Sequence, residues 1–205
     1  RRATVVEASA GETHAIRFSD VAHSSGLRFT FVGADQPVRR GRRIFEVLGA
    51  GIAVFDFDRD GWPDVYCAQG SSPNSRGEDR DCLFRNSGDA TFVDITGAAG
   101  LGDDRFSQGV AIGDFDNDGF PDLLVANVGE NRLYQNNGDG TFSEVTDWAS
   151  TGEHQWTSSC AIADLNGDGL PDIYEVNYLG GKEVFSVICD ASGDVAGGSC
   201  RPRDF

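Results

Sequence analysis

The sequence is organised around one stretch, Gly51-Ile-Ala-Val-Phe-Asp-Phe-Asp-Arg-Asp-Gly-Trp-Pro-Asp-Val-Tyr66. The same pattern returns at Gly109-Val-Ala-Ile-Gly-Asp-Phe-Asp-Asn-Asp-Gly-Phe-Pro-Asp-Leu-Leu124 and at Ser159-Cys-Ala-Ile-Ala-Asp-Leu-Asn-Gly-Asp-Gly-Leu-Pro-Asp-Ile-Tyr174. In each copy, short apolar runs flank an acidic turn that contains Gly and Pro. Such runs predict β-strands, and a repeat of about 50 residues predicts units of one kind packed side by side.

A second phrase follows the first two copies, at Leu83-Phe-Arg-Asn-Ser-Gly-Asp-Ala-Thr-Phe-Val-Asp-Ile-Thr96 and at Leu133-Tyr-Gln-Asn-Asn-Gly-Asp-Gly-Thr-Phe-Ser-Glu-Val-Thr146. Each phrase predicts two short strands around a Gly-Asp turn, because Asn and Gly tolerate the positive φ of tight hairpins. One repeat therefore holds four strands. Four antiparallel strands in about 50 residues predict an all-β protein built of β-propeller blades.

The repeats describe a single partial propeller over residues 1–205. Phe18-Ser-Asp-Val-Ala22 repeats the last strand of a blade, although nothing before it supplies the other strands. An open arc of blades would expose apolar faces and unpaired strand edges, so we expect a longer closed propeller or completion by another chain. The predicted segments are an N-terminal outer strand and loop (1–49), two blades (50–101 and 102–152) and an incomplete blade with a cysteine-bracketed loop (153–205).

Each acidic loop has the form D-x-[DN]-x-D-G-x-P-D. Side-chain oxygens at the first, third, fifth and ninth positions, with a backbone carbonyl at the seventh, suit Ca²⁺, which takes six to eight oxygen ligands. Mg²⁺ fits less well because it demands tighter octahedral geometry and keeps more water. We expect three structural Ca²⁺ sites, since each loop otherwise crowds like charges together. The predicted ligands are Asp56, Asp58, Asp60, Asp64 and the Trp62 carbonyl; Asp114, Asp116, Asp118, Asp122 and the Phe120 carbonyl; and Asp164, Asn166, Asp168, Asp172 and the Leu170 carbonyl.

Two other interpretations of the loops compete with this one. Residues 164–175 satisfy the EF-hand pattern, with Glu175 at the twelfth position. An EF-hand needs a helix on each side, whereas these flanks are short β-branched runs, and Pro171 removes the amide at the eighth position. Solvated turns without metal are the simpler alternative, but three loops at matching repeat positions favour metal sites.

Charge and hydropathy exclude some partners. The chain has 17 Lys and Arg against 33 Asp and Glu, a formal net charge of −16. Such a surface repels a polyphosphate, so we expect no nucleic-acid partner. No apolar run approaches the roughly 20 residues that cross a bilayer, so we expect no transmembrane segment.

Five cysteines complete the pattern. Cys67 and Cys82 bracket a polar loop, and Cys189 and Cys200 bracket a Gly- and Ser-rich one. We expect loop-closing disulfides of the kind that persist in oxidising compartments, with free thiols in a cytosolic protein as the alternative. Cys160 is the odd cysteine and is expected to pack as a small apolar residue.

The acidic loops, the Gly-Ala-Gly-Ile-Ala-Val-Phe-Asp lead-in and the Asn-x-Gly-Asp-Gly-Thr-Phe phrase resemble FG-GAP and VCBS repeats, the blades of integrin α-subunit-like propellers. Phe18-Ser-Asp-Val, Glu46-Val-Leu-Gly-Ala-Gly51 and Cys200-Arg-Pro-Arg-Asp-Phe205 are similar to the cartilage acidic protein 1-like (ASPIC/UnbV-associated) secreted proteins. The resemblance implies a seven-bladed, calcium-stabilised propeller, secreted or periplasmic, that serves adhesion or scaffolding and has no established chemistry.

We therefore expect a calcium-binding module at the cell surface or outside the cell that is not an enzyme and has no catalytic residues. Its predicted partner is another protein or the remaining blades. A calcium-dependent glycan-binding propeller is the alternative, with flat faces offered by Trp62, Trp148, Trp156, Tyr66 and Tyr178, although propeller aromatics are more often core. A hydrolase is less favoured, because the chain has three His (14, 23 and 154) and no nucleophile motif.

Overall fold

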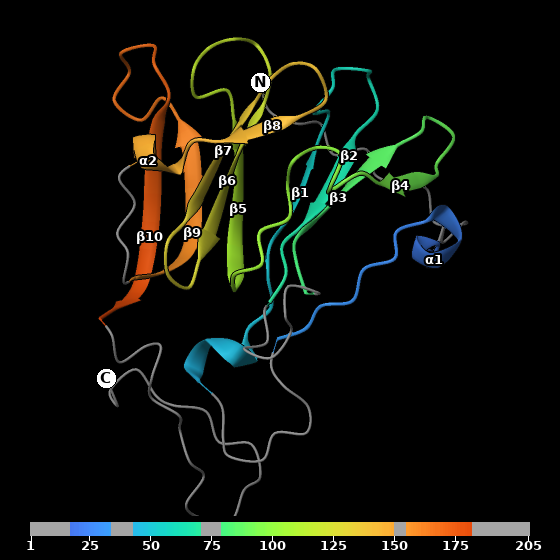
Figure 1. Ribbon diagram of the computed structural model, residues 1–205, viewed down its shortest axis with the longest axis horizontal. Coiled ribbons are helices and arrows are strands. Elements are labelled where there is room, and N and C mark those ends of the chain that lie inside the picture. The colour runs from blue at the N-terminus through green and yellow to red at the C-terminus, as the bar shows by residue number, and fades with distance from the viewer. Residues whose placement is uncertain (1–16, 34–42, 71–78, 150–154, 182–205) are drawn as a thin grey trace, which may run out of the picture.

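The computed structural model describes residues 17–33, 43–70, 79–149 and 155–181. Within them, the strands form three antiparallel sheets that stand side by side (Figure 1). Three short helices accompany the sheets: α1 (Ala22–Ser25), the 3-10 helix η1 (Ile44–Val47) and α2 (Thr146–Ala149). No helix of the described residues is long and apolar enough to cross a membrane.

Two of the sheets have four strands each, in sequence order. The first sheet contains β1 (Ile52–Phe55), β2 (Asp64–Cys67), β3 (Cys82–Asn86) and β4 (Phe92–Asp94). The middle sheet contains β5 (Ser107–Gly113), β6 (Asp122–Asn127), β7 (Arg132–Asn136) and β8 (Phe142–Glu144). The third sheet contains β9 (Gln155–Ala163) and β10 (Asp172–Gly180). The predicted all-β class and the four-stranded antiparallel blades are confirmed.

The three acidic loops occupy the same place in the three sheets. Each joins the first strand to the second, and the loop's ninth residue pairs with the last residue of the first strand: Phe55 with Asp64, Gly113 with Asp122 and Ala163 with Asp172. The Gly-Asp turns join the third strand to the fourth, where Asn86 pairs with Phe92 and Asn136 with Phe142. Equal register places all three loops at the same end of the sheets (Figure 1).

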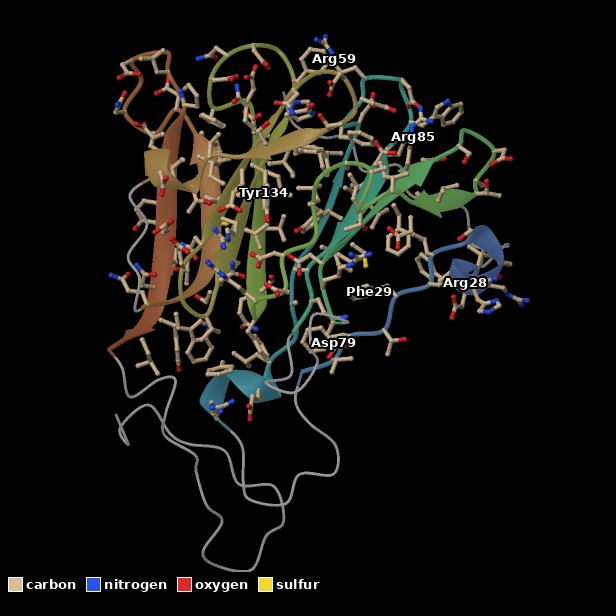
Figure 2. All side chains as sticks on the ribbon, viewed as in Figure 1. Arg28, Phe29, Arg59, Asp79, Arg85 and Tyr134 are labelled. Atoms are coloured by element: carbon tan, nitrogen blue, oxygen red, sulfur yellow. The ribbon has the colours of Figure 1, made fainter. Side chains whose placement is uncertain are left out.

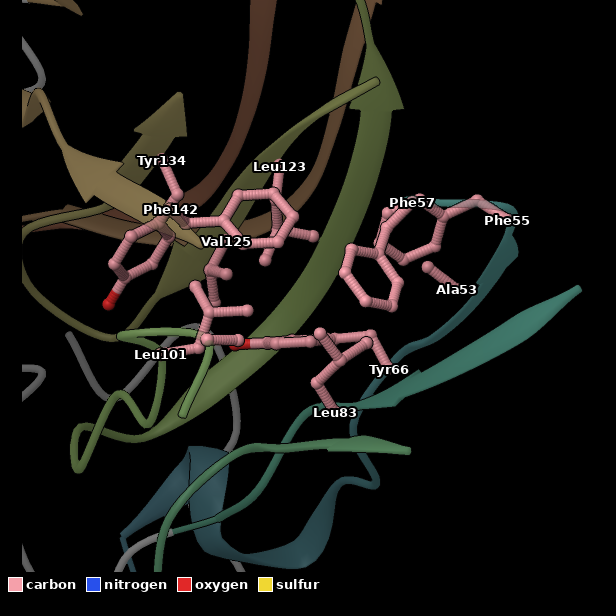
Figure 3. Packing of buried hydrophobic residues seen from close by; sticks show 11 residues of the cluster. Ala53, Phe55, Phe57, Tyr66, Leu83, Leu101, Leu123, Val125, Tyr134 and Phe142 are labelled. Carbon is pink, nitrogen blue, oxygen red and sulfur yellow. The ribbon is translucent and has the colours of Figure 1, made fainter. Parts of the chain in front are cut away.

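Burial shows how the sheets pack. All six residues of β6 are buried, because the middle sheet is covered on both faces. In β1, Ala53 and Phe55 are buried while Ile52 and Val54 are exposed, which is the period-two pattern of a strand covered on one face. A hydrophobic cluster fills the space between the first two sheets (Figure 3); its largest members are Phe55, Phe57, Tyr66, Leu83, Leu123, Tyr134 and Phe142.

Glycines let the inner strands approach one another. A Cβ on Gly51 would lie 3.2 Å from the carbonyl oxygen of Gln108, and a Cβ on Gly109 would lie 3.1 Å from that of Ser158. Both glycines occupy the same repeat position, immediately before the apolar run of the first strand. A larger residue there would push neighbouring sheets apart, so the repeated glycine sets the spacing between blades.

Part of the N-terminal segment repeats contacts that are made at the end of the first blade. The amide of Leu27 donates to the Ala22 carbonyl (2.9 Å), as that of Leu101 donates to Thr96 (3.0 Å). Gly26 lies against the carbonyl of Phe92, at the start of β4, just as Gly100 lies against that of Phe142, at the start of β8. Residues 22–27 therefore occupy the position of the turn that follows the outer strand of a preceding blade.

The segment Phe18–Ala22, which the sequence predicts to be an outer strand, is not a strand in the structure. Residues 17–21 belong to none of the described sheets, and Ala22 begins α1. An outer strand is hydrogen-bonded to the third strand of its own blade, and the described residues contain no such strand before β1. The division of the chain into segments at residues 49, 101 and 152 remains a prediction.

A buried polar network, which the sequence pattern does not predict, links the first two sheets. The carboxylate of Asp81 accepts hydrogen bonds from the Tyr66 hydroxyl (2.7 Å), the Ser107 hydroxyl (3.0 Å) and the Gln69 amide (2.6 Å). Its own amide donates to the carbonyl of Asp103 (2.9 Å). Burial raises the pKa of the Asp81 carboxyl to about 8, and the neighbouring Asp103 adds to the rise.

This pKa predicts a pH dependence of folding. Because the folded-state pKa of Asp81 lies above the ordinary value of 3.8, its contribution to stability is complete below pH 4 and is lost as the pH rises through 8. We expect the free energy of unfolding in urea to fall over this range, with a share from Asp81 of up to about 1.4 kcal/mol per pH unit. Asp81→Asn, which keeps the shape and removes the titration, should flatten the slope between pH 6 and 8.

Asp104→Asn, at an exposed position, is the control and should keep the wild-type slope. If Asp81→Asn and the wild type showed the same slope, Asp81 would not be the titrating group.

Candidate metal centre

The carboxylate at the first loop position organises each loop. We call residues 56–64, 114–122 and 164–172 the first, second and third loops. Asp56 accepts the amides of Asp60 (3.0 Å) and Gly61 (2.8 Å). Asp114 accepts the matching amides of Asp118 (3.0 Å) and Gly119 (2.9 Å). The loop backbone thus folds around this side chain, because its carboxylate accepts the amides of two consecutive loop residues.

Two backbone positions in each loop are left-handed. The glycine at the sixth position has φ between 86° and 93° in Gly61, Gly119 and Gly169, which is the sharp reversal that the sequence predicts. The fourth position is also left-handed, in Arg59 (58°), Asn117 (58°) and Gly167 (81°). Sequence reasoning missed this second reversal. Arg59 does not signal it, but Asn117 and Gly167 at the matching position do, because Asn and Gly tolerate positive φ.

The carboxylate at the ninth position is held from two sides. In Asp64, Oδ2 accepts the Phe57 amide (3.1 Å) and Oδ1 accepts the Asn86 amide (2.8 Å). Asp122 makes the matching bonds, with the amides of Phe115 and Asn136 (both 2.8 Å). Both side chains are fully buried, and burial together with nearby loop carboxylates raises the pKa of each to about 6. A charge in this environment is costly unless a cation compensates it.

In the first two loops, three of the four predicted carboxylates come together. One oxygen each of Asp56, Asp58 and Asp64 lies within 4.8 Å of the others, and the same holds for Asp114, Asp116 and Asp122. Ligands of a single Ca²⁺ at 2.3–2.6 Å are separated by at most about 5 Å, so these oxygens fit one such ion. The fourth carboxylate, Asp60 or Asp118, accepts the amide of the seventh residue instead (2.9 and 2.8 Å).

The third loop has the same framework with different details. Asp164 accepts the amides of Gly167 (2.6 Å) and Gly169 (2.9 Å). Asn166, at the third position, donates from its side chain to Asp168 (3.1 Å) and Asp172 (3.5 Å). Among the described residues, its carboxylates do not form a group as close as those of the first two loops. An amide in place of a carboxylate removes one negative charge from this loop.

An asparagine in the second phrase joins the loop to the hairpin. Besides its amide bond to Asp64, Asn86 donates from its side chain to the Pro63 carbonyl (3.0 Å) and accepts the Gly88 amide (3.0 Å). Asn136 makes the same bonds to Pro121 (3.1 Å) and Gly138 (3.0 Å). From the sequence, these asparagines are predicted to form turns only. Their recurrence beside the turn is the signal from which a positioning role follows.

Asn136 also reaches the preceding loop. Its side chain donates to the Phe57 carbonyl (2.8 Å), and Phe57 is the residue whose amide holds Asp64. The first and second loops are therefore mechanically connected through one side chain.

The first and second loops are bound by side chains of different charge. Arg85 binds two carboxylates of the first loop, from Nε to Asp58 Oδ2 (2.6 Å) and from Nη2 to Asp60 Oδ2 (2.9 Å). Gln135, at the matching position of β7, donates to Asp116 Oδ2 (2.5 Å). Arg59 leaves its own loop and donates to the Gly119 carbonyl (3.1 Å), with its guanidinium 5.5 Å from the Phe120 ring centroid. Figure 2 shows Arg59 and Arg85 at the loop end of the sheets.

Of the aromatic residues predicted to offer faces to a glycan, Trp156 and Tyr178 contact each other (ring centroids 4.9 Å apart), but the described ones do not form one exposed surface. Trp156 and Tyr66 are buried. Trp62, 50% exposed, lies in the first loop, and the exposed Tyr178 lies near the opposite end of β10. Trp148 is in α2, and nothing more is described of its side chain. The described aromatics therefore provide no shared platform for a sugar ring.

The remaining candidate residues are placed as follows. His23 is exposed in α1, and His14 and His154 lie outside the described residues. Cys67 and Cys82 are direct register partners on β2 and β3, and both are free thiols here. Cys160 is a free, half-buried thiol on β9, and Cys189 and Cys200 lie outside the described residues.

Comparison with known proteins gives two results. A family model described as an FG-GAP-like repeat matches residues 56–125 and 114–175. These matches begin at the first carboxylates of the first and second loops and together cover more than half of the chain. A stretch of 80 residues is 38% identical to cartilage acidic protein 1 of Xenopus tropicalis, 36% to that of Homo sapiens and 35% to that of Mus musculus. It covers 38% of this chain and 11% of each relative, so the match concerns a small part of those proteins.

The turn glycines predict a second effect on stability. Gly138 and Gly140 belong to the same hairpin turn and both have positive φ (73° and 89°), so alanine strains the backbone at either position. A Cβ on Gly138 would lie 2.8 Å from Phe120 Cε2, whereas a Cβ on Gly140 meets nothing within 4 Å. We expect Gly138→Ala to lower the free energy of unfolding by about 1 kcal/mol more than Gly140→Ala does.

Urea unfolding of the two variants at one pH measures the difference, and Gly140→Ala serves as the matched control. Equal losses would show that the packing of the second loop on the hairpin contributes nothing.

Proposed function

We propose that this chain, which belongs to the FG-GAP-like repeat family, is a calcium-stabilised propeller module that acts outside the cytosol as a scaffold for protein interaction. The family membership rests on the match over most of the repeated region. The single observation that carries the metal part is the arrangement of Asp56, Asp58 and Asp64, and of their counterparts in the second loop, within 4.8 Å of one another. Backbone amides hold these carboxylates in place, and only Oδ2 of the third-position residue, Asp58 or Asp116, accepts no backbone amide. Each amide uses one lone pair of a carboxylate oxygen, so a second lone pair remains for a cation.

The ion's part in this proposal is charge compensation. The side chains that would hold it are those of the first, third, fifth and ninth positions in each loop, with the carbonyls of Trp62, Phe120 and Leu170. A bound Ca²⁺ would offset the cost of keeping Asp64 or Asp122 ionised in a buried position. The third loop, with Asn166 and one carboxylate fewer, is the third proposed site.

The interaction part rests on what the loop end exposes. Trp62, Leu165 and Leu170 project from the first and third loops and are half or more exposed. Apolar side chains on rigid, metal-ordered loops suit the core of a protein interface, which favours apolar and aromatic anchors. A scaffold requires no acid–base pair or nucleophile, and we propose no catalytic role for the chain. A glycan-binding role has less support, because Trp62 and Tyr178 lie at opposite ends of the sheets.

We propose further that these blades belong to a larger, seven-bladed ring. Residues 22–27 repeat the contacts that residues 96–101 make at the end of the first blade, which supports a preceding blade. At the other side, Tyr174, Val176 and Tyr178 leave β10 with an exposed apolar surface. Since each blade of a propeller is packed on both faces, a further blade is the natural cover for this surface.

Calcium is expected to raise the melting temperature. A ligand that binds only the folded state stabilises it by about 2.7 kcal/mol when its concentration is 100 times its dissociation constant. We expect removal of divalent ions by a chelator to lower the melting temperature by at least about 5 °C, and Ca²⁺ to restore it more effectively than Mg²⁺ at the same concentration. Differential scanning calorimetry measures both changes.

Asp64→Asn and Asp122→Asn should each reduce the calcium-induced rise, and Asp104→Asn, at an exposed position outside the loops, should not. A melting temperature that changes neither with the chelator nor with added Ca²⁺ would refute the metal sites.

The location outside the cytosol predicts a disulfide between Cys67 and Cys82. As register partners on adjacent antiparallel strands, their Cα atoms are separated by about the distance that a disulfide spans. We propose that the two thiols lose two protons and two electrons to a disulfide oxidant of the secretory route or periplasm and form an S–S bond that closes the polar loop. A closed loop of about 15 residues is worth about 3 kcal/mol in the chain-entropy description.

Mass spectrometry of peptides from protein expressed with an export signal, digested without reductant, tests this pairing. The expected result is a cross-linked peptide pair for Cys67 and Cys82, with the half-buried Cys160 alkylated only after unfolding. Complete alkylation of Cys67 and Cys82 in unreduced protein would contradict the pairing.

A further inference from the structure

We propose that Arg85 makes the first loop a weaker calcium site than the second, so that the second loop fills before the first. This inference rests on the proposed function, because it concerns the relative affinity of two of its metal sites. It adds that two sites with nearly the same hydrogen bonds differ in calcium affinity because of one charged side chain outside the loops.

The contacts of Arg85 are with oxygens that a metal ion would use. Its guanidinium binds Asp58 Oδ2 (2.6 Å) and Asp60 Oδ2 (2.9 Å), while the other oxygen of each carboxylate accepts a loop amide. The oxygens of Asp58 and Asp60 that accept no loop amide are thus the ones that bind Arg85. A cation entering the first loop must share these carboxylates with a positive charge already present.

The second loop provides the comparison. Gln135 occupies the position of Arg85: both stand on the third strand of their sheet, one residue before the asparagine that holds the ninth carboxylate. Gln135 donates to the third-position carboxylate, as Arg85 does, but carries no charge. The amide bonds to the first and ninth carboxylates agree between the two loops to within 0.3 Å. The charge of the side chain that contacts the loop carboxylates therefore differs between the two loops, whereas the framework hardly differs.

Arg59 does not remove this difference. It binds the Gly119 carbonyl and stacks near the Phe120 ring, and neither contact engages a carboxylate oxygen of the second loop. Its charge lies near the second loop, so it weakens binding there without competing for ligand atoms. Arg59→Gln is consequently a useful control for charge alone.

The size of the effect follows from exposure. The side chain of Arg85 is 44% exposed, so solvent and salt screen its charge. Exposed ion pairs are worth a fraction of a kcal/mol to about 1 kcal/mol, which corresponds to about a two- to fivefold change in affinity. The effect should shrink as the salt concentration rises.

The first loop carries its own spectroscopic reporter. Its seventh residue is Trp62, whereas the second and third loops have Phe120 and Leu170 there. Tb³⁺, which takes oxygen ligands as Ca²⁺ does, luminesces when a nearby excited tryptophan transfers energy to it. Luminescence excited through tryptophan and lost in Trp62→Phe therefore reports occupancy of the first loop.

The test is a Tb³⁺ titration of wild type, Arg85→Gln, Arg85→Lys and Arg59→Gln, with Ca²⁺ binding followed by calorimetry. We expect Arg85→Gln to lower the Tb³⁺ concentration for half-maximal Trp62-sensitised luminescence about two- to fivefold at low salt. Arg85→Lys, which keeps the charge, should stay closer to the wild type. Arg59→Gln, which removes a charge without freeing a carboxylate oxygen of the first loop, should change the first loop's affinity less than Arg85→Gln does. Without metal, the Arg85→Gln variant should have a lower melting temperature than the wild type, because the first loop loses the positive charge that offsets Asp58 and Asp60.

The reverse exchange, Gln135→Arg, should weaken the tighter calcium phase in calorimetry by a similar factor. An Arg85→Gln variant whose first loop binds Tb³⁺ no more tightly than the wild type would overturn the inference while leaving the metal sites intact. If neither Tb³⁺ nor Ca²⁺ bound the wild type, the proposed function itself would fail and this inference with it.

Discussion

The buried carboxylate that ends the first and second loops is the constraint on which the rest of the structure depends. Asp64 and Asp122 are the first residues of β2 and β6, and each binds amides from the start of its own loop and from the hairpin of its sheet. One side chain thus joins three segments that are separate in the sequence. Because an isolated buried carboxylate is costly, the same feature that ties the blade together also creates the demand for a cation.

From this constraint the architecture can be followed outward. The loop fixes the first two strands in register, the asparagine of the hairpin fixes the third, and Asn136 extends the connection to the loop of the previous sheet. The opposite end is held by the Asp81 network, in which Tyr66 and Ser107 come from adjacent sheets. Apolar residues fill the space between these two polar ends, and glycines at the inner strands set how closely the sheets approach.

Much of this architecture was predictable from the sequence, because the same short-range pattern of strand and turn residues occurs in each repeat. The alternation around Phe55, the glycine at Gly61 and the Gly-Asp turns each depend on neighbours within a few residues, and these predictions of strands and reversals agree with the structure. What the sequence did not reveal are contacts made across distance. Arg85 lies 27 residues from Asp58, and Asn136 lies 79 residues from Phe57, so nothing local marks either contact. The hydrogen bonds of Asp81 could not be predicted for the same reason, since its partners belong to two different sheets.

The most direct test of the account is the location of metal ions in crystals grown with Ca²⁺ or soaked in Tb³⁺. Anomalous scattering should show one ion in the first loop and one in the second, each within coordination distance of the first-, third- and ninth-position carboxylates, Asp64 and Asp122 among them. Anomalous maps without peaks in the loops, obtained from crystals in which the three sheets keep their arrangement, would contradict the claim that a cation compensates these buried charges.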